Sequence, residues 1–278
     1  MRTNISGLDH VVILVRDLDA AQATYARLGL TLTPRGFHSI GTHNHCIMFD
    51  SDYVELLAVR EPHPVTKYFS QFLADAEGAA ALAFSTDDAR AAHASLRASG
   101  VMADEPVDFS RPVDMDGIRR EARFRVVQLP VNETPGCRAF LCQHDTPDLV
   151  WRPQYQRHAL GVVGVDGISV LVEDVDETVK AYARVVDTPP TETAAGWSLA
   201  AGGCTFSFFD RAALEQRLGS RALPRRDAPM LVALRLRVRD RDLASEVLRR
   251  GGFTPERLSD GALVIGASQA HGVALVLV

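Results

Sequence analysis

The sequence has few cysteines and lacks any long apolar run. Its four cysteines are spread over 278 residues and none belongs to a Cys-x-x-Cys pair, so neither a zinc ribbon nor a disulfide framework is indicated. A membrane-spanning helix needs roughly 20 consecutive apolar residues, and the first residues lead into a strand pattern instead of the apolar core of a signal peptide. We therefore expect a soluble, cytoplasmic protein with reduced thiols and no membrane partner.

The chain has no excess of positive charge, since 30 basic residues, nearly all arginine, stand against 35 acidic ones. The formal net charge is −5 and the chain has only two lysines, whereas a general nucleic-acid binder presents a basic face. The Gly-x-Gly-x-x-Gly, P-loop and Gly-x-Ser-x-Gly motifs are absent, so nucleotide binding and hydrolase chemistry have no local support. The partner that we expect is a small molecule and not a nucleic acid.

The composition is that of a globular protein, because 46% of the residues are apolar and 23% are charged; this argues against disorder and against a coiled coil. Within it, one pattern recurs at fixed spacing. The copies are VRDLD at residues 15–19, VEDVD at 172–176, VRDRD at 238–242 and a weaker FSTDD at 84–88. The first two copies are each followed, at the same distance, by the tripeptide YAR.

Each copy predicts an apolar strand, an aspartate suited to capping a helix, and then the helix itself. In the first copy the helix is expected to end at Gly29, and three short strands follow, at about residues 30–34, 42–49 and 53–59. The repeating unit is therefore βαβββ. Four such units fit the chain, at about residues 7–60, 78–146, 163–211 and 229–278.

Pairing of these units predicts an α+β protein with two cupped-sheet domains. The N-terminal domain is expected at residues 1–150 and the C-terminal domain at residues 160–278, with the boundary between about 146 and 163. The segment WRPQ at residues 151–154 is predicted to be a linker, because proline and polar residues break both periodicities there. Whether two chains form a homodimer is left open.

Two strand sequences connect this architecture to a known family. Paired βαβββ units that open with GLDHVV at residues 7–12 and close the first unit with YVELL at residues 53–57 resemble the vicinal oxygen chelate superfamily, specifically its glyoxalase-like domains. The resemblance implies that two units form a cupped sheet around a divalent metal, with ligands from the first and fourth strands of each unit. His10 and Glu55 match the two ligand positions of the first unit.

The residues themselves are consistent with this resemblance. A strand alternates its faces, so His10 shares a face with Val12 and Leu14. A carboxylate inside the apolar run around Glu55 is costly to bury without a partner, and a metal ion would supply that partner. The alternative is a solvent-exposed glutamate at a strand edge together with a hydrogen-bonded core histidine.

The second unit departs from the family pattern. Its first-strand ligand position, counted back from the aspartate pair, falls on Ala80, which cannot bind a metal. Its fourth strand offers His144 or Cys142 as a third ligand. Two histidines and one carboxylate would suit Fe(II), Mn(II) or a similar ion, and Fe, Mn, Zn, Ni and Mg cannot be distinguished. His144 is also the candidate catalytic base, with a displaced Glu55 as the alternative; it can equally be a hydrogen-bonding residue at the strand end.

The C-terminal half departs further. Its counted first-strand positions are Gly167 and Ala233, and Ala274 stands where Glu55 stands in the first unit. None of these residues coordinates a metal, so the C-terminal cup is expected to hold none. We expect a degenerate copy that serves stability, assembly or substrate enclosure.

Three further residues are predicted to line the N-terminal cup and bind substrate. Strand alternation directs Arg123 and Arg125 to the concave side if the apolar face of that strand meets the helix. Guanidinium groups there favour a carboxylate, enolate or phosphate substrate, since they form directed pairs of hydrogen bonds to such groups. The alternative is that these arginines lie at an open sheet edge or pair with Glu121. Asn44 is expected to point into the cup, while a metal pair made by His43 and His45 is the competing interpretation of that strand.

The leading hypothesis is a metal-dependent enzyme that binds a small, oxygen-rich, anionic substrate in the N-terminal cup. The metal would stabilise developing enolate charge, while enolate-type, lyase and dioxygenase chemistry all stay open. The alternatives are a metal-free binding protein, like the drug-sequestering members of the superfamily, and an extradiol-type dioxygenase with an N-terminal iron site.

Overall fold

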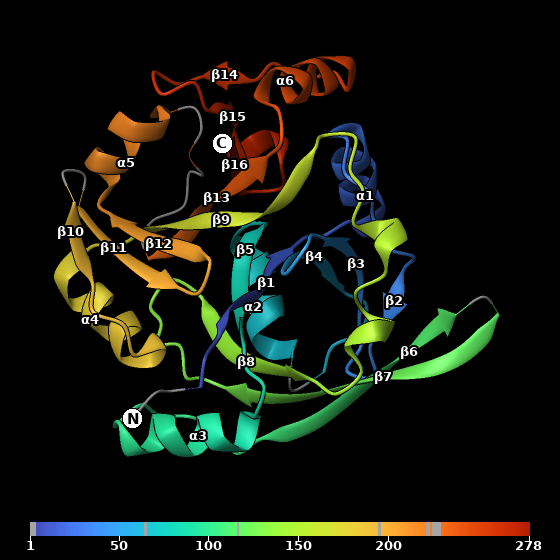
Figure 1. The fold of residues 1–278 in the computed structure, drawn as a ribbon, viewed down its shortest axis with the longest axis vertical. Coiled ribbons are helices and arrows are strands. Elements are labelled where there is room, and N and C mark those ends of the chain that lie inside the picture. Colours follow the sequence, from blue (N-terminus) through green and yellow to red (C-terminus); the bar gives the residue numbers. More distant parts are fainter. Residues whose placement is uncertain (1–3, 64–65, 116, 194–195, 221–222, 224–228) are drawn as a thin grey trace.

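A computed structural model describes residues 4–278 except residues 64–65, 116, 194–195, 221–222 and 224–228. The chain forms two eight-stranded sheets, with strand orders β2-β3-β4-β1-β5-β8-β7-β6 and β10-β11-β12-β9-β13-β16-β15-β14. Their central strands meet in the middle of the molecule and helices lie around them (Figure 1). No helix in the described part of the chain is long and apolar enough to span a membrane.

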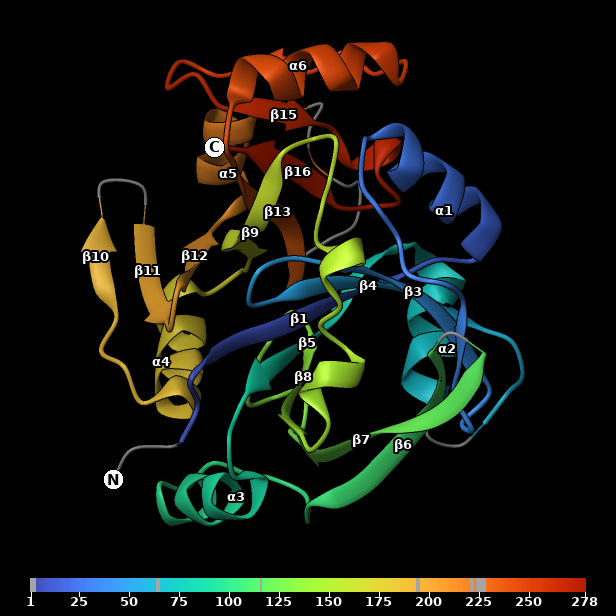
Figure 2. The same ribbon diagram turned by 45° about the vertical axis from the view of Figure 1, so that its right-hand side comes forward.

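The first sheet and its helices use the chain up to residue 144. In order, the elements are β1 (Gly7–Leu14), α1 (Leu18–Arg27), β2 (Gly36–Phe37), β3 (Thr42–Met48), β4 (Tyr53–Val59), α2 (Lys67–Asp75), β5 (Gly78–Ser85), α3 (Ala89–Ala98), β6 (Val107–Met115), β7 (Ile118–Gln128) and β8 (Arg138–His144). Strands β6 and β7 form a long hairpin that extends away from the rest of the sheet (Figure 2).

Two short 3-10 helices, Pro147–Leu149 and Pro153–Tyr155, connect the sheets. The second half then contains β9 (Val162–Leu171), α4 (Val175–Val186), β10 (Thr191–Thr193), β11 (Gly196–Ala201), β12 (Cys204–Phe209), α5 (Arg211–Leu218), β13 (Met230–Val238), α6 (Arg241–Arg250), β14 (Glu256–Arg257), β15 (Leu263–Ile265), a 3-10 helix (Ala267–Gln269) and β16 (Ala274–Leu277).

The predicted fold class, four tandem βαβββ units paired into two glyoxalase-like sheets, is confirmed. Within each unit the first strand pairs in parallel with the last, as β1 does with β4 and β9 does with β12. The two units of a sheet join through their antiparallel first strands, β1 with β5 and β9 with β13. Each sheet therefore has an approximate internal two-fold symmetry.

The recurring aspartate explains why the units start alike. Asp17, Asp88, Asp174 and Asp240 are the N-caps of α1, α3, α4 and α6, and each side chain accepts backbone N–H groups of the first helical turn. Short carboxylates satisfy these free donors and favour the positive end of the helix. The caps therefore set the strand-to-helix transition in all four units.

The second strand of the first unit differs from the prediction. Residues 30–34 are not a strand, and the short β2 begins only at Gly36. Pro34 lacks a backbone N–H and cannot continue a ladder. Thr33 holds this segment against β3 instead, because its backbone N–H donates to the Cys46 carbonyl and its hydroxyl accepts the Cys46 N–H.

The two sheets pack against each other through one continuous hydrophobic core. Phe84 of β5 and Phe206 of β12 lie with ring centroids 5.8 Å apart across this junction, and β5 runs beside β13. The division into domains at residues 1–150 and 160–278 stays a prediction, because the shared core couples the halves.

A buried carboxylate at this junction gives a pH-dependent prediction. Asp52 is 6% exposed and accepts the Val165 N–H at 2.9 Å, beside a cavity of about 310 Å³ that Arg237 also lines. Burial raises the pKa of Asp52 to about 6. A raised carboxyl pKa means that the folded state binds the extra proton, so stability falls as pH rises from about 4 to about 6.

Asp52→Asn keeps an acceptor for Val165 and removes the charge, so it should stabilise the protein by about 1 to 3 kcal/mol at pH 8. The gain should vanish at pH 4, where wild-type Asp52 is protonated in the folded protein. Urea unfolding of both proteins across this range measures the difference. A difference that does not change with pH would show that the pKa is not raised.

Candidate metal centre

A β-bulge in β1 places two adjacent polar residues in the N-terminal cup. Leu8 pairs with Phe84 and His10 pairs with Ala83, which leaves Asp9 as an extra residue on β1. A bulge of this kind interrupts strand alternation and redirects the side chains beside it. Asp9 and His10 are consequently both buried, at 2% and 4% exposure, and they contact each other.

His10 connects Asp9 to Glu55. Its Nδ1 lies 2.5 Å from Asp9 Oδ1, and its Nε2 lies 3.8 Å from Glu55 Oε2. The ring stacks on Tyr53, with centroids 4.3 Å apart. The structure thus brings together His10 and Glu55 as the sequence predicts; their role as ligands stays a prediction.

Glu55 lies on β4 and is 8% exposed. One oxygen, Oε1, accepts a hydrogen bond from the Asn44 amide, so Asn44 does point into the cup. The same oxygen lies 3.9 Å from Nε2 of His38, which follows β2 directly. His38 was not among the residues predicted from the sequence, because a two-residue strand carries no periodic signal.

Both imidazoles have one nitrogen occupied and the other directed at Glu55. The Nδ1 of His38 lies 2.8 Å from the Thr42 hydroxyl, as Nδ1 of His10 lies against Asp9. An N–H at each Nδ1 leaves a lone pair at each Nε2, which is the form that binds metals. Burial lowers the pKa of His38, and Glu55 partly offsets this effect, so the neutral form is favoured.

The two imidazoles approach different oxygens of Glu55, at 3.8 Å for His10 and 3.9 Å for His38. A tetrahedral ion with bonds of about 2.0 to 2.2 Å holds its ligand atoms about 3.4 Å apart. With one ligand atom from each residue, the three do not all lie within 4.8 Å of one another, so a bound ion would require both imidazoles to move toward Glu55. The chemistry of the residues fits a divalent ion, since a buried carboxylate and two imidazoles form a mixed N/O ligand set.

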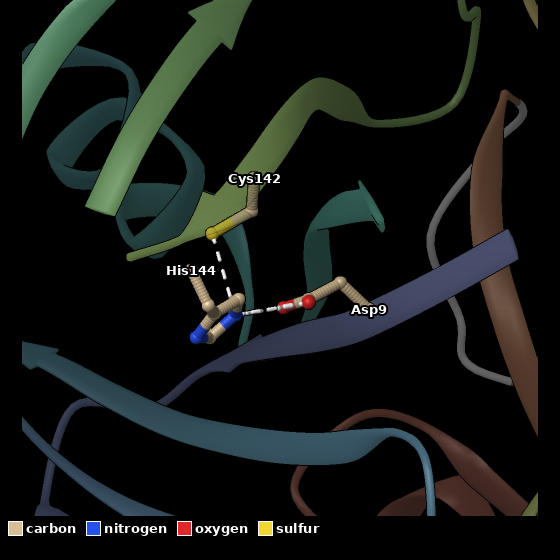
Figure 3. A group of neighbouring side chains, drawn as sticks. All are labelled: Asp9, Cys142 and His144. Carbon is tan, nitrogen blue, oxygen red and sulfur yellow. Dashed lines mark hydrogen bonds and ion pairs between the residues drawn. The ribbon is translucent and has the colours of Figure 1, made fainter. Parts of the chain in front are cut away.

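A second polar cluster shares Asp9. His144 of β8 has its Nε2 2.9 Å from Asp9 Oδ2, and Cys142 Sγ lies 3.6 Å from the same nitrogen. Figure 3 shows Asp9 of β1 pointing at His144 and Cys142 from β8. The ligand atoms of these three residues all lie within 4.8 Å of one another, close enough to hold a metal ion.

The charges of this second cluster favour a hydrogen-bonded arrangement. Burial alone would raise the pKa of Asp9, but hydrogen bonds from His10 and His144 outweigh it and hold the pKa at about 2. Burial raises the pKa of Cys142 well above its usual value, so the thiol stays protonated and is a poor ligand. His144 and Cys142 were the two predicted third ligands, and His144 is held by Asp9. The second histidine found beside Glu55 is His38 instead.

The predicted faces of β7 are reversed. Ala122 and Phe124 are buried in the cup with Tyr53, because this end of the cup is aromatic and takes the apolar face of the strand. Arg123 is exposed, and Arg125 pairs with Asp108 at 2.6 Å. Both arginines therefore lie on the face away from the candidate centre, and we no longer assign them to substrate.

His43 and His45, the competing His-x-His metal pair, contact different parts of the protein. His45 Nδ1 lies 2.8 Å from the Thr33 carbonyl, and the His43 ring lies 6.3 Å from that of Phe37. The two residues thus have different local partners, and the hydrogen bonds and ion pairs of Glu55 with described residues involve Asn44, His10 and His38 instead.

A family model described as a glyoxalase-like domain matches residues 8–186, which is more than half of the chain. The chain belongs to the glyoxalase-like domain family. This result confirms the resemblance inferred from residues 7–12 and 53–57. A comparison with curated protein sequences finds no significant match.

Solved structures share the fold of this glyoxalase-like protein at low identity. A hypothetical protein from Staphylococcus aureus matches with a TM-score of 0.70 and 14% identity, over 98% of each chain. A mutant of 4-hydroxymandelate synthase from Streptomyces coelicolor matches with a TM-score of 0.58 and 17% identity, over 92% of this chain and 77% of that chain. A fusion of a xylose isomerase-like TIM barrel with 4-hydroxyphenylpyruvate dioxygenase matches with a TM-score of 0.56 and 14% identity, over 98% of this chain and 49% of that chain.

The strand register corrects one position in this glyoxalase-like chain. His10 lies two residues before Val12, and Val12 pairs with Glu55. In the second unit the corresponding pair is Ala83 and Phe140. The position equivalent to His10 is therefore Ala81, not Ala80. The sequence-based prediction counted back from Asp87, but Asp88 is the residue that caps the helix, so the predicted position was one residue too early.

In the second sheet the same register confirms the two positions predicted to correspond to His10 and corrects the one predicted to correspond to Glu55. Gly167 and Ala233 are equivalent to His10. The position equivalent to Glu55 is Ser207 in the third unit and Val276 in the fourth, whereas Ala274 is equivalent to Tyr53. That no metal binds in this cup stays a prediction.

Proposed function

We propose that this glyoxalase-like protein is a metal-dependent enzyme that acts on a small, oxygen-rich anion in its N-terminal cup. His10, His38 and Glu55 would hold the divalent ion. The observation that carries the proposal is a buried carboxylate flanked by two imidazole Nε2 atoms, at 3.8 and 3.9 Å. A buried carboxylate without a cation is unfavourable, and a divalent ion removes that cost.

Each surrounding residue then has a role. Asp9 would fix the tautomer and the orientation of His10, and Thr42 would do the same for His38. Asn44 would hold Glu55 in place through its amide. The bound ion would act as a Lewis acid that stabilises negative charge developing on substrate oxygen.

His144 is the residue that we propose as the general base. Its Nε2 is held by Asp9, and its Nδ1 is buried with no hydrogen-bond partner among the described residues. A carboxylate that fixes one imidazole nitrogen leaves the other free to accept a proton. Together these groups support proton removal next to a carbonyl, the enolate-type chemistry, ahead of lyase or dioxygenase chemistry.

Metal content tests the proposal directly. Protein purified without chelators and without a histidine tag should contain about one equivalent of a transition metal per chain, since the positions equivalent to His10 and Glu55 in the second sheet carry no strong ligands. Elemental analysis measures this content and identifies the ion. Protein that contains no metal and also fails to bind added Mn²⁺, Fe²⁺ or Zn²⁺ would refute the proposal.

One observation favours the second candidate, a metal-free binding protein. The part of the cup near His144 is aromatic: the His144 ring contacts Phe124 and Trp151, at centroid distances of 5.0 and 4.7 Å. The buried Trp151 Nε1 also has no hydrogen-bond partner among the described residues. A planar apolar ligand with one polar group would satisfy this region without any ion.

A further inference from the structure

An arginine from the β6–β7 hairpin faces the candidate metal centre. Arg111 of β6 stands directly opposite Ala122 of β7, and Ala122 is fully buried in the cup together with Tyr53. Residues directly opposite in neighbouring strands share one face of the sheet. Phe109 lies on the same face as Arg111, and its ring contacts that of His38 at 5.6 Å. Arg111 is therefore directed to the cup.

The arginine reaches the site where β6 approaches β2. A Cβ placed on Gly36 would lie 3.6 Å from Arg111 Nη1 and 2.3 Å from Asn44 Oδ1. The missing side chain at residue 36 thus leaves room for Asn44 Oδ1 and brings Arg111 Nη1 next to β2. Alanine at this position would collide with Asn44 and displace it from Glu55.

The Arg111 side chain makes no hydrogen bond and no ion pair with any residue that the structure describes. Arg125, on the opposite face of the hairpin, pairs with Asp108 at 2.6 Å. Arg111 is close enough to act on two residues of the cup: burial lowers the pKa of His38 and the charge of Arg111 lowers it further, while burial raises the pKa of Cys46 to about 12 against the charge of Arg111. A partly buried guanidinium of this kind is suited to a bidentate anion.

We propose that Arg111 is the anion-binding residue of a subsite for a single carboxylate group of the substrate. This inference rests on the proposed function, because the neighbouring oxygen of the substrate would face Glu55, His10 and His38. A carboxylate is favoured over a phosphate, because one arginine matches one negative charge. The substrate class is then a short 2-oxo or 2-hydroxy carboxylate.

Ligand titration of arginine variants tests this assignment. The probes are pyruvate, its neutral analogue pyruvamide, and methylphosphonate, titrated calorimetrically into the Mn²⁺-loaded protein. Arg111→Gln should weaken pyruvate binding about 10- to 100-fold, the range expected for a lost charge-assisted pair, and leave pyruvamide unchanged. Arg111→Lys should fall between the two, because lysine keeps the charge and loses the planar fork.

Arg125→Gln is the matched control, because it removes an arginine from the other face of the same hairpin; its pyruvate affinity should equal that of the wild type. Equal pyruvate affinities for Arg111→Gln and the wild type would overturn the proposal. So would a wild type that binds pyruvamide as well as pyruvate, binds methylphosphonate more tightly, or binds none of the three. If Arg111→Gln does not fold, unchanged binding in Arg111→Lys would overturn the bidentate assignment.

A second measurement separates this proposal from the proposed function. Mn²⁺ affinity, followed by electron paramagnetic resonance, should be the same in Arg111→Gln and the wild type. If the wild type binds no Mn²⁺ but its pyruvate binding still depends on Arg111, the metal proposal fails and the carboxylate subsite stands. If Mn²⁺ binds normally and pyruvate binding is indifferent to Arg111, the subsite fails and the metal proposal stands.

Discussion

Glu55→Gln is expected to reduce metal affinity by at least about 100-fold while the fold stays intact. Glutamine keeps the volume of the side chain, and its carbonyl oxygen can still accept the hydrogen bond that Asn44 donates to Glu55. It loses the negative charge, which supplies most of the attraction for a divalent ion in a buried site. Metal titration followed by calorimetry measures the affinity, and circular dichroism checks the fold.

Glu133→Gln provides the matched control. Glu133 is also a buried carboxylate, at 4% exposure, but it lies outside the cup, where it accepts the Met102 N–H at 3.1 Å and faces Arg184. Its glutamine variant should bind metal like the wild type. Full metal occupancy in Glu55→Gln would show that the proposed centre is wrong, and the binding-protein candidate would then move ahead.

The fold was predictable because its signals are local and repeated. Each unit carries its own capping aspartate, and the cap fixes the start of a helix within one or two residues. Four copies at similar spacing then define the topology without any long-range information. The strand expected at residues 30–34 failed for an equally local reason, since Pro34 cannot donate to a ladder.

The candidate site was predictable only where strands are regular. His10 and Glu55 lie on strands that pair in register, and the family resemblance supplied their positions. Asp9 was missed because strand alternation assigns it to the face opposite His10, whereas the bulge between Leu8 and His10 brings it into the cup. A one-residue irregularity of this kind leaves no sequence pattern.

The arginines were misassigned for a different reason. Both faces of β7 are covered in part, by helix α3 on one side and by the cup on the other, so an alternating strand does not reveal which face is inside. The apolar face of β7 meets the aromatic residues of the cup, and the anion-facing role passes to Arg111 on the neighbouring strand. That assignment depends on the approach of β6 to β2, which is a tertiary contact.

The same tertiary arrangement gives the centre a balanced charge. Two carboxyl side chains, Glu55 and Asp9, lie in the cup; burial raises the pKa of Asp9, but hydrogen bonds from His10 and His144 hold it at about 2. A divalent ion at Glu55 would neutralise both. Arg111 would then carry the one remaining positive charge and a substrate carboxylate would match it. Buried sites favour such neutrality because unpaired charge is strongly penalised there.

Asp9→Asn should therefore weaken metal binding about 10- to 100-fold, the usual effect of removing a carboxylate that orients a ligand histidine. Asparagine loses the negative charge and one of the two acceptor oxygens. An oxygen in place of Oδ1 can still reach both imidazoles, as Oδ1 does at 2.5 and 3.2 Å, but the amide NH2 would then face His144 where Oδ2 does now. Losing these charge-assisted hydrogen bonds should also lower the free energy of unfolding by about 3 to 5 kcal/mol. Asp52→Asn, which alters a buried aspartate outside the cup, should leave metal affinity unchanged. Calorimetric metal titration and urea unfolding measure the two effects, and wild-type metal affinity in Asp9→Asn would show that Asp9 does not control the tautomer of His10.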